Sequence, residues 1–100
     1  KKYSINFICA LNNFEVKLGT HSKGDKDPEA IANKTAKSIT ILIKGKFIIR
    51  FPKDKKEINL SNTGDYVFWD NNTSHISEAL EDSVTLTIRW PSIPNDQIKY

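Results

Sequence analysis

Two histidines, His21 and His75, are the side chains of this sequence best suited to chemistry near neutral pH. Imidazoles ligate divalent transition metals, and a site made of both with a carboxylate such as Asp70 or Asp25 would suit Zn, Mn, Fe or Ni. Such a site requires both rings to face one cavity. Otherwise His21 is a polar surface or loop residue, and His75 either contacts a pocket or makes a structural hydrogen bond.

Few residues of this chain are suited to other kinds of catalysis. The sequence holds no Gly-x-Ser-x-Gly elbow, and its four glycines lie too far apart for a phosphate-binding loop. The single cysteine, Cys9, excludes an internal disulfide and a zinc site built from thiolates. It alternates with Ile5 and Phe7, which predicts a small buried apolar side chain.

Aromatic residues gather at positions 66, 68 and 69. Tyr66 and Phe68 are candidate ligand contacts, together with Arg89 from a later segment. Exposed aromatic rings on a barrel also stack nucleic-acid bases, which leaves an oligonucleotide-binding barrel as an alternative. The competing interpretation is that this segment contributes to the core and to a dimer interface.

The elements that must position these residues are strands, because apolar and polar residues alternate with period two. The alternation puts His21 on the face of Glu15 and Lys17, away from an apolar core, unless a kink at Gly19 turns it inward. About eight short strands are predicted, at 3–9, 14–20, 39–43, 47–51, 58–60, 66–69, 75–80 and 83–90.

The connections between these strands are predicted from turn residues. Segment 39–51 is expected to form a hairpin that turns at Lys44-Gly45-Lys46, and 91–100 an irregular tail. Asp27-Pro28 is typical of a helix start, so 30–37 is the place for one short helix or an ordered loop. This density of strands favours an all-β sandwich or barrel.

Residues 64–75, GDYVFWDNNTSH, resemble the second conserved motif of the cupin superfamily. Gly64 and His75 fall in register with its glycine and histidine, Asp70 stands where the proline would be, and Asn72 replaces a glycine. Asn tolerates left-handed backbone, so that exchange is physically inexpensive. Segment 39–47 also resembles the hairpin that closes the first cupin motif.

The resemblance covers about residues 14–90. It implies a double-stranded β-helix, the jelly-roll barrel of small RmlC-like cupins, with at most one short helix and a single domain over residues 1–100. It also implies that the usual metal centre is missing or rebuilt. Metal-binding cupins carry His-x-His and Glu in the first motif, whereas Ser38 stands at the Glu position and 31–34 holds no histidine. We therefore predict no cofactor and at most a loosely bound divalent transition metal.

Charge and composition bound the partners. The net charge of +3 comes from 15 Lys and Arg that alternate with 12 Asp and Glu. Nucleic-acid surfaces normally cluster basic residues, so a nucleic-acid partner is not expected. No stretch approaches the ~20 apolar residues of a membrane span, and the N-terminus does not resemble an export signal. We expect a cytoplasmic protein without a membrane partner.

The sequence leaves three functions open. The first is a small cupin-like barrel that binds a small molecule through His75, His21, Arg89, Tyr66 and Phe68, with any catalysis undecided. The second is a metal-dependent cupin enzyme, an isomerase or oxygenase, with a site rebuilt at His21 and His75. The third is the oligonucleotide-binding barrel. We also expect a homodimer that uses the strand at 3–9 and its neighbour, because sheet edges invite pairing.

Overall fold

Antiparallel strands make up almost all of the regular structure in the computed structural model, which describes the backbone of residues 3–10, 13–93 and 95–99 and the side chains of 13–93 and 95–97. The all-β prediction is confirmed. In chain order the elements are β1 (Tyr3–Ala10), β2 (Glu15–His21), β3 (Ile31–Asn33), β4 (Lys37–Lys44), β5 (Phe47–Phe51), the 3-10 turn η1 (Pro52–Asp54), β6 (Lys56–Leu60), β7 (Tyr66–Trp69), β8 (Ile76–Ala79), β9 (Ser83–Trp90) and β10 (Gln97–Lys99).

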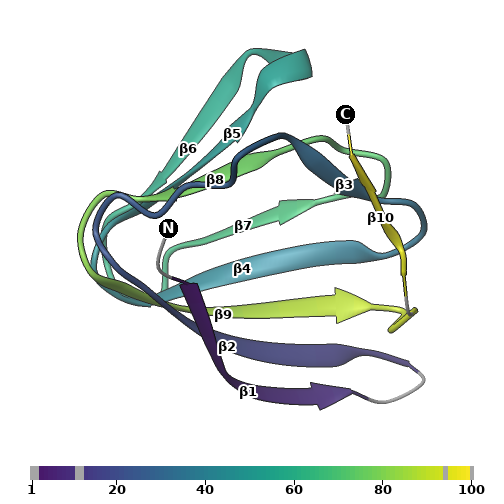
Figure 1. Ribbon diagram of the computed structural model, residues 1–100, viewed down its shortest axis with the longest axis horizontal. Helices are drawn as coiled ribbons and strands as arrows, with labels where there is room; N and C mark the ends of the chain where they lie inside the picture. The colour runs from purple at the N-terminus through teal and green to yellow at the C-terminus, as the bar shows by residue number, and fades with distance from the viewer. Residues whose placement is uncertain (1–2, 11–12, 94, 100) are drawn as a thin grey trace.

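Two sheets enclose the interior of the molecule (Figure 1). The larger has the order β1-β2-β9-β4-β7, and the smaller has the order β6-β5-β8. A short pair, β3 with β10, completes the arrangement, and all of these pairs are antiparallel. This is the double-stranded β-helix that the sequence predicted.

The predicted hairpin over 39–51 is wrong, although both of its strands exist. β4 pairs with β7 and β9, whereas β5 pairs with β6 and β8. The turn around Gly45 therefore carries the chain from one sheet to the other. Gly45 has φ of 98°, and a Cβ atom there would lie 2.4 Å from the carbonyl oxygen of Asp82, so the crossing requires glycine.

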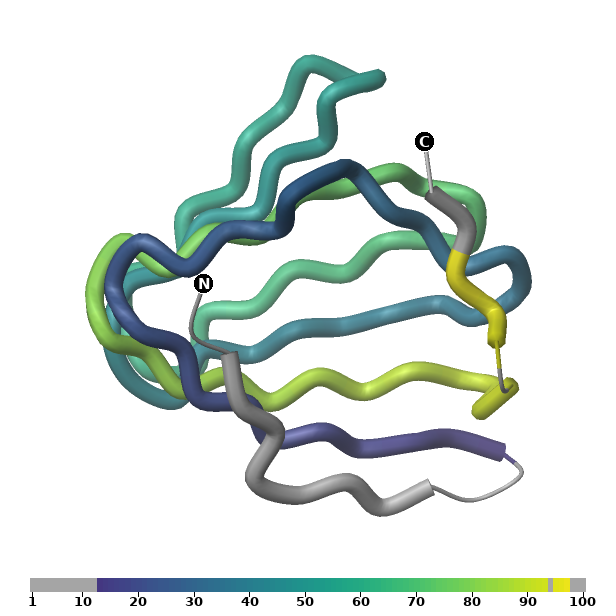
Figure 2. The backbone as a smooth tube through the Cα atoms, viewed as in Figure 1, coloured from purple at the N-terminus to yellow at the C-terminus, as the bar shows by residue number. Residues whose placement is uncertain are grey.

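The polar segment after β2 is not helical, as Figure 2 shows where it runs beside β8. Its backbone pairs with that strand: the Asp27 amide donates to the Ser77 carbonyl at 3.0 Å, and the Ile31 and His75 amides donate to each other's carbonyls. Helix signals at Asp27-Pro28 lose to these long-range bonds because only one large apolar residue, Ile31, could anchor a helix. Within the predicted irregular tail, β10 pairs with β3.

The sequence assignment at the second motif is confirmed at Asn72, whose φ of 57° is left-handed backbone. The Asn72 amide donates to the Asn33 carbonyl at 2.7 Å, which ties this turn to β3. The side chain of Cys9, predicted to be buried, lies outside the described side chains. No helix in the described part of the chain is long and apolar enough to cross a membrane.

An apolar core fills only part of the space between the sheets. It joins both sheets through one cluster of buried side chains: Leu42, Phe47, Ile49, Phe51, Leu60, Val67, Trp69 and Ala79. Elsewhere the larger sheet turns its polar residues inward. Its inner face carries Lys17, Gly19, His21, Thr40, Thr85, Thr87 and Arg89, and by alternation its outer face carries Val16, Leu18, Ile39, Ile41, Tyr66, Phe68, Leu86 and Ile88.

Candidate functional site: a polar cavity between the sheets

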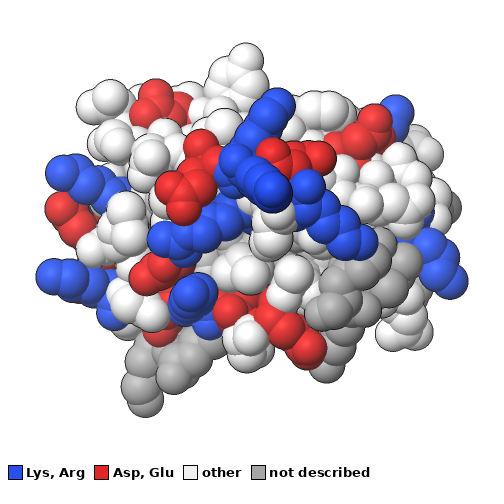
Figure 3. All heavy atoms as spheres, turned by 90° about the horizontal axis from the view of Figure 1, so that it is seen from above, with Lys and Arg blue, Asp and Glu red and all other residues white. Residues whose placement is uncertain are grey.

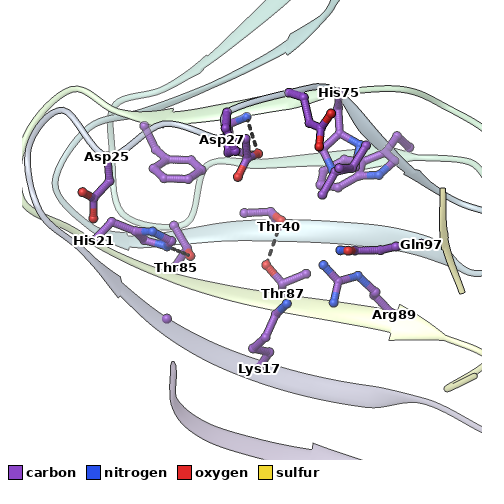
Figure 4. Close-up of a pocket in the computed structure, with 17 residues that line it drawn as sticks. Lys17, His21, Asp25, Asp27, Thr40, His75, Thr85, Thr87, Arg89 and Gln97 are labelled. Atoms are coloured by element: carbon purple, nitrogen blue, oxygen red, sulfur yellow. Dashed lines mark hydrogen bonds between the residues drawn. The ribbon is translucent and has the colours of Figure 1, made fainter. Parts of the chain in front are cut away.

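A cavity of about 410 Å³ lies between the larger sheet and the segment that runs along β8 (Figure 4). Its floor is formed by β2, β9 and β4, and its roof by residues 25–31 and the start of β8. The lining is mostly polar, with Lys17, His21, Asp25, Asp27, Glu29, Thr40, His75, Ser77, Thr85, Thr87, Arg89 and Gln97, to which Gly19, Pro28, Ile31, Phe47 and Trp69 add nonpolar surface.

Strand register brings the floor residues together. Lys17 and Thr40 both pair with Thr87, and the Thr40 and Thr87 hydroxyls share a hydrogen bond of 2.9 Å. Glu15 pairs with Arg89, two residues further along the same two strands. Side chains two residues apart on a strand share a face, so Lys17 and Arg89 are diagonal neighbours over the floor.

His21 faces the cavity, an orientation that the sequence left open. Its Nε2 lies 3.0 Å from the Thr85 hydroxyl, and its ring lies 4.9 Å from the Phe47 ring. No kink is needed, because the polar face of β2 is the inner face. A Cβ atom on Gly19 would lie 3.2 Å from the His21 Nε2, so glycine leaves room for the imidazole.

His75 is buried, with 4% of its surface exposed, and lines the opposite side of the cavity. Its Nδ1 lies 3.2 Å from the Thr73 carbonyl oxygen, and a carbonyl only accepts, so Nδ1 carries the proton and donates. Its ring lies 4.5 Å from that of Trp69. Burial lowers the pKa of His75, so the neutral ring is favoured and Nε2 remains an acceptor.

The acids of the roof are held by backbone amides. Asp25 accepts a hydrogen bond from the Ser22 amide at 3.0 Å, and Asp27 accepts one from the Ser77 amide at 2.9 Å. These bonds fix the bend after β2 and its attachment to β8. The two carboxylates therefore have structural roles as well as surface in the cavity.

Lys17 carries the most perturbed charge of the cavity. Burial, followed by repulsion from Arg89, lowers its pKa to about 8, while Glu15 and Asp27 oppose that shift. Arg89 has one ionic contact, 3.7 Å from its Nη1 to a Glu15 carboxylate oxygen. The inner face of the larger sheet thus holds two half-buried cations, with Glu15 and Asp27 nearby.

The described residues do not provide the donor set of a metal centre. No group of three His, Cys, Asp or Glu side chains among them could hold an ion. Asp70 is exposed, does not line the cavity and accepts from the Asn71 amide. Ser38, at the expected Glu position, is buried and accepts from the Asn33 amide group. Only His21 and His75 of the candidate ligands, with Asp25, reach the cavity.

The cavity contains three of the five residues predicted to contact a ligand: His75, His21 and Arg89. The prediction that Tyr66 and Phe68 line the same pocket is wrong. They pair with Ile41 and Ile39 on the outer face of the larger sheet and are 63% and 49% exposed. Alternation along β7 separates them from Trp69, which does line the cavity.

Sequence reasoning missed Lys17, Asp27, Thr87 and Gln97. The signal was present in two polar stripes, Glu15-Lys17-Gly19-His21 and Thr85-Thr87-Arg89, which the pairing of β2 with β9 places side by side. Each stripe alone is typical of a solvated strand face. Only the topology, which is not visible in either segment, shows that both stripes face inward.

The fold is that of cupins, as comparison with solved structures shows. The structure of KdgF from Halomonas sp. aligns with a TM-score of 0.76 at 18% identity, covering 93% of this chain and 80% of that chain. A cupin superfamily protein from Desulfitobacterium hafniense aligns with a TM-score of 0.78 at 13% identity, over 91% and 79% of the two chains. An RmlC-like cupin from Desulfovibrio desulfuricans gives 0.77 at 17%, over 92% and 85%.

Sequence comparison gives no match of its own. No model of a known protein family matches the chain, and no curated protein matches it. The structural relatives therefore support the cupin fold, and the identity of any ligand must come from the cavity itself.

Proposed function

We propose that this protein binds a small polar molecule in the cavity between its two sheets. The observation that supports the proposal is the polar inner face of the larger sheet, which lines about 410 Å³ of space. Pockets for small molecules span roughly 300–1,000 Å³ and combine apolar walls with a few polar groups. Phe47, Trp69 and Ile31 supply apolar wall here, while Lys17 and Arg89 supply charge.

The histidines have distinct roles in this proposal. His75 presents its Nε2 as an acceptor, because Nδ1 donates to the Thr73 carbonyl. His21 is positioned by the Thr85 hydroxyl and by the Phe47 ring, and it closes one end of the floor. Both orientations are fixed without a ligand, which reduces the entropy lost on binding.

A blocked cavity tests this proposal. Gly19→Val adds a branched side chain whose Cβ would lie 3.2 Å from the His21 Nε2, closer than an ordinary contact, so it should displace the imidazole into the cavity and fill the space over β2. We expect small molecules found by a thermal-shift and NMR screen to lose binding to this variant. The matched control is Leu18→Ile, one residue earlier on the outer face, which should bind as wild type does. Equal binding by Gly19→Val would contradict the proposal.

We also propose that the protein carries no tightly bound transition metal, since no three His, Cys, Asp or Glu side chains of the described residues gather into a possible site and the cavity holds the cations Lys17 and Arg89. A rebuilt centre would have to recruit weak oxygen ligands. Elemental analysis of protein prepared without chelator tests this, with His21→Ala and His75→Ala alongside. About one metal per chain, lost in both variants, would favour the metal-dependent enzyme instead.

The third function receives no support from the arrangement of charges. On the face that Figure 3 shows, Lys and Arg are interspersed with Asp and Glu. The exposed rings of Tyr66 and Phe68 lie on the outer face among aliphatic side chains and not in a basic groove. Retention on single-stranded DNA that weakens with salt would revive the oligonucleotide-binding alternative.

We propose a homodimer in which a second copy covers the outer face of the larger sheet. Paired positions place Val16, Ile88, Ile39 and Phe68 in one apolar row across four strands, and Leu18, Leu86, Ile41 and Tyr66 in the next. A two-fold dimer buries the same patch on both copies, and flat apolar rows suit that symmetry. This extends the expected interface beyond β1 and β2. A light-scattering mass of one chain at micromolar concentration would contradict it.

A further inference from the structure

The floor of the cavity concentrates positive charge at one end. Figure 4 shows Lys17 and Arg89 projecting from neighbouring strands, Lys17 next to Thr87 and Arg89 further along β9 with Gln97 beside it. The register of β2 with β9 fixes this arrangement, because Glu15 pairs with Arg89 and Lys17 with Thr87. The Lys17 ammonium makes no hydrogen bond or ion pair with any other side chain that the structure describes.

Two residues that line the cavity each have a buried donor without an acceptor. Among the described residues, the buried side-chain nitrogens or oxygens without a hydrogen-bond partner are Trp69 Nε1 and Arg89 Nε. Both can only donate, and both residues line the cavity. A buried donor without a hydrogen-bond partner costs free energy, so the site is suited to a ligand rich in acceptor oxygens.

Nearby acids limit the charge that such a ligand can carry. Glu15 lies 3.7 Å from Arg89, and Asp27 interacts electrostatically with Lys17. Lys17 and Arg89 carry two positive charges against the two negative charges of Glu15 and Asp27, and Arg89 repels the Lys17 ammonium. A ligand with one negative charge meets less repulsion from these carboxylates than a dianion does.

We infer that the end of the cavity formed by Lys17, Arg89 and Trp69 is an anion subsite, and that the bound molecule is a small monocarboxylic acid. Its carboxylate accepts from the Lys17 ammonium and from the Arg89 guanidinium, whose planar donors match two carboxylate oxygens. Hydroxyl groups on the rest of the molecule meet Gln97, His75 Nε2 and the threonines of the floor. The inference rests on the proposed binding function and names the class of ligand.

The test uses acids paired with alcohols of the same carbon skeleton. Lactate is compared with propane-1,2-diol, and D-gluconate with D-glucitol, while inorganic phosphate and citrate serve as anions of higher charge. Binding is followed by the fluorescence of Trp69 in a Trp90→Phe background, because Trp90 does not line the cavity. Titrations are repeated in Lys17→Met, Arg89→Lys and, as a control, the exposed Lys44→Met.

We expect at least one monocarboxylate to bind at least about tenfold more tightly than its alcohol, since hydrogen bonds to charged groups contribute more than neutral ones. Lys17→Met should weaken that binding at least about tenfold, Arg89→Lys should weaken it less, and Lys44→Met should leave it unchanged. The thermal midpoint of each variant shows that it is folded.

Three results would overturn the inference and leave the proposed function standing. In the first, the alcohols bind as tightly as their acids; in the second, phosphate or citrate binds more tightly than every monocarboxylate. In the third, Lys17→Met binds the carboxylates as tightly as the wild-type protein does. If only neutral or cationic molecules bind and Gly19→Val abolishes their binding, the anion subsite is again wrong. If no molecule of any charge binds in the cavity, both the inference and the proposed function fail.

Discussion

On the inner face of the larger sheet, Lys17, Thr87 and Arg89 border a cavity, whereas on the outer face Tyr66 and Phe68 lie exposed. Most half-buried sheets place apolar residues on the inside and polar residues outside. The reversal occurs in a sheet that also contributes Leu42 and Val67, from β4 and β7, to the apolar core. Alternation therefore identifies the two faces of a strand but does not show which of them faces the interior.

The largest effect should come from the part of the inner face that is apolar. Leu42→Ala removes a side chain with no exposed surface and should lower the free energy of unfolding by about 2–5 kcal/mol. Leu80→Ala makes the same change at a position that is 38% exposed and should cost much less. Urea denaturation of both variants measures the difference. Equal losses would mean that the apolar core does not lie where the larger sheet meets β5.

The polar part of the inner face should respond in the opposite direction. Lys17→Met replaces a partly buried ammonium with an apolar chain of similar length and should raise the free energy of unfolding by about 1–3 kcal/mol. Lys44→Met, at an exposed position, should change it by less than about 0.5 kcal/mol. Urea denaturation compares the two. A destabilised Lys17→Met would show that the ammonium has a favourable partner inside the protein.

Acid should weaken the fold through His75. Its pKa is lowered in the folded protein because the ring is buried, so the unfolded chain binds more protons below its ordinary pKa of about 6.5. The free energy of unfolding therefore decreases as the pH falls below about 6.5. Thermal midpoints between pH 7.5 and 5 should decrease, and the decrease should be smaller in His75→Gln. An identical profile in both proteins would rule out His75 as a source of that loss.

The outer face should tolerate polar substitution best. Phe68→Ser, at a side chain that is 49% exposed, should leave the far-ultraviolet circular dichroism unchanged and reduce the light-scattering mass from two chains to one. The fold keeps its core because Phe68 contributes nothing to it, and its nearest ring partner is Trp90 at 6.0 Å. The control variant is Ser92→Ala, at a partly buried residue that follows β9. An unchanged mass would contradict the proposed interface.

Sequence patterns predicted local features of this fold well. Period-two alternation located β2, β4, β5 and β9, and the resemblance to the second cupin motif, in which Asn72 replaces a glycine, implied the left-handed conformation of that residue. Long-range pairing was not available from these patterns. The segment after His21 has helix signals, yet its amides bond to β8, and the turn at Gly45 connects two sheets where a hairpin was expected.

The candidate site was only partly predictable for the same reason. His75 and His21 were recognised by residue type, and Arg89 by its place on the last long strand. Lys17 has the sequence context of a solvated residue, since it stands between Val16 and Leu18 in an alternating strand. Its inward orientation depends on β2 pairing with β9, a contact between residues about seventy positions apart. Charge on an inner face is set by topology, which local patterns do not encode.

The polar face of the larger sheet is its inner face, and the titration of Lys17 tests this orientation most directly. The groups that act on its ammonium are Arg89 on β9, Glu15 on β2 and Asp27 in the roof. Carbon-detected NMR of the lysine side chains, with Lys17→Met to assign the resonance, should find Lys17 titrating with a pKa of about 8. If Lys17 instead titrates near 10.5, the ordinary value for lysine, its ammonium lies in solvent and the polar face of the larger sheet is not the inner face.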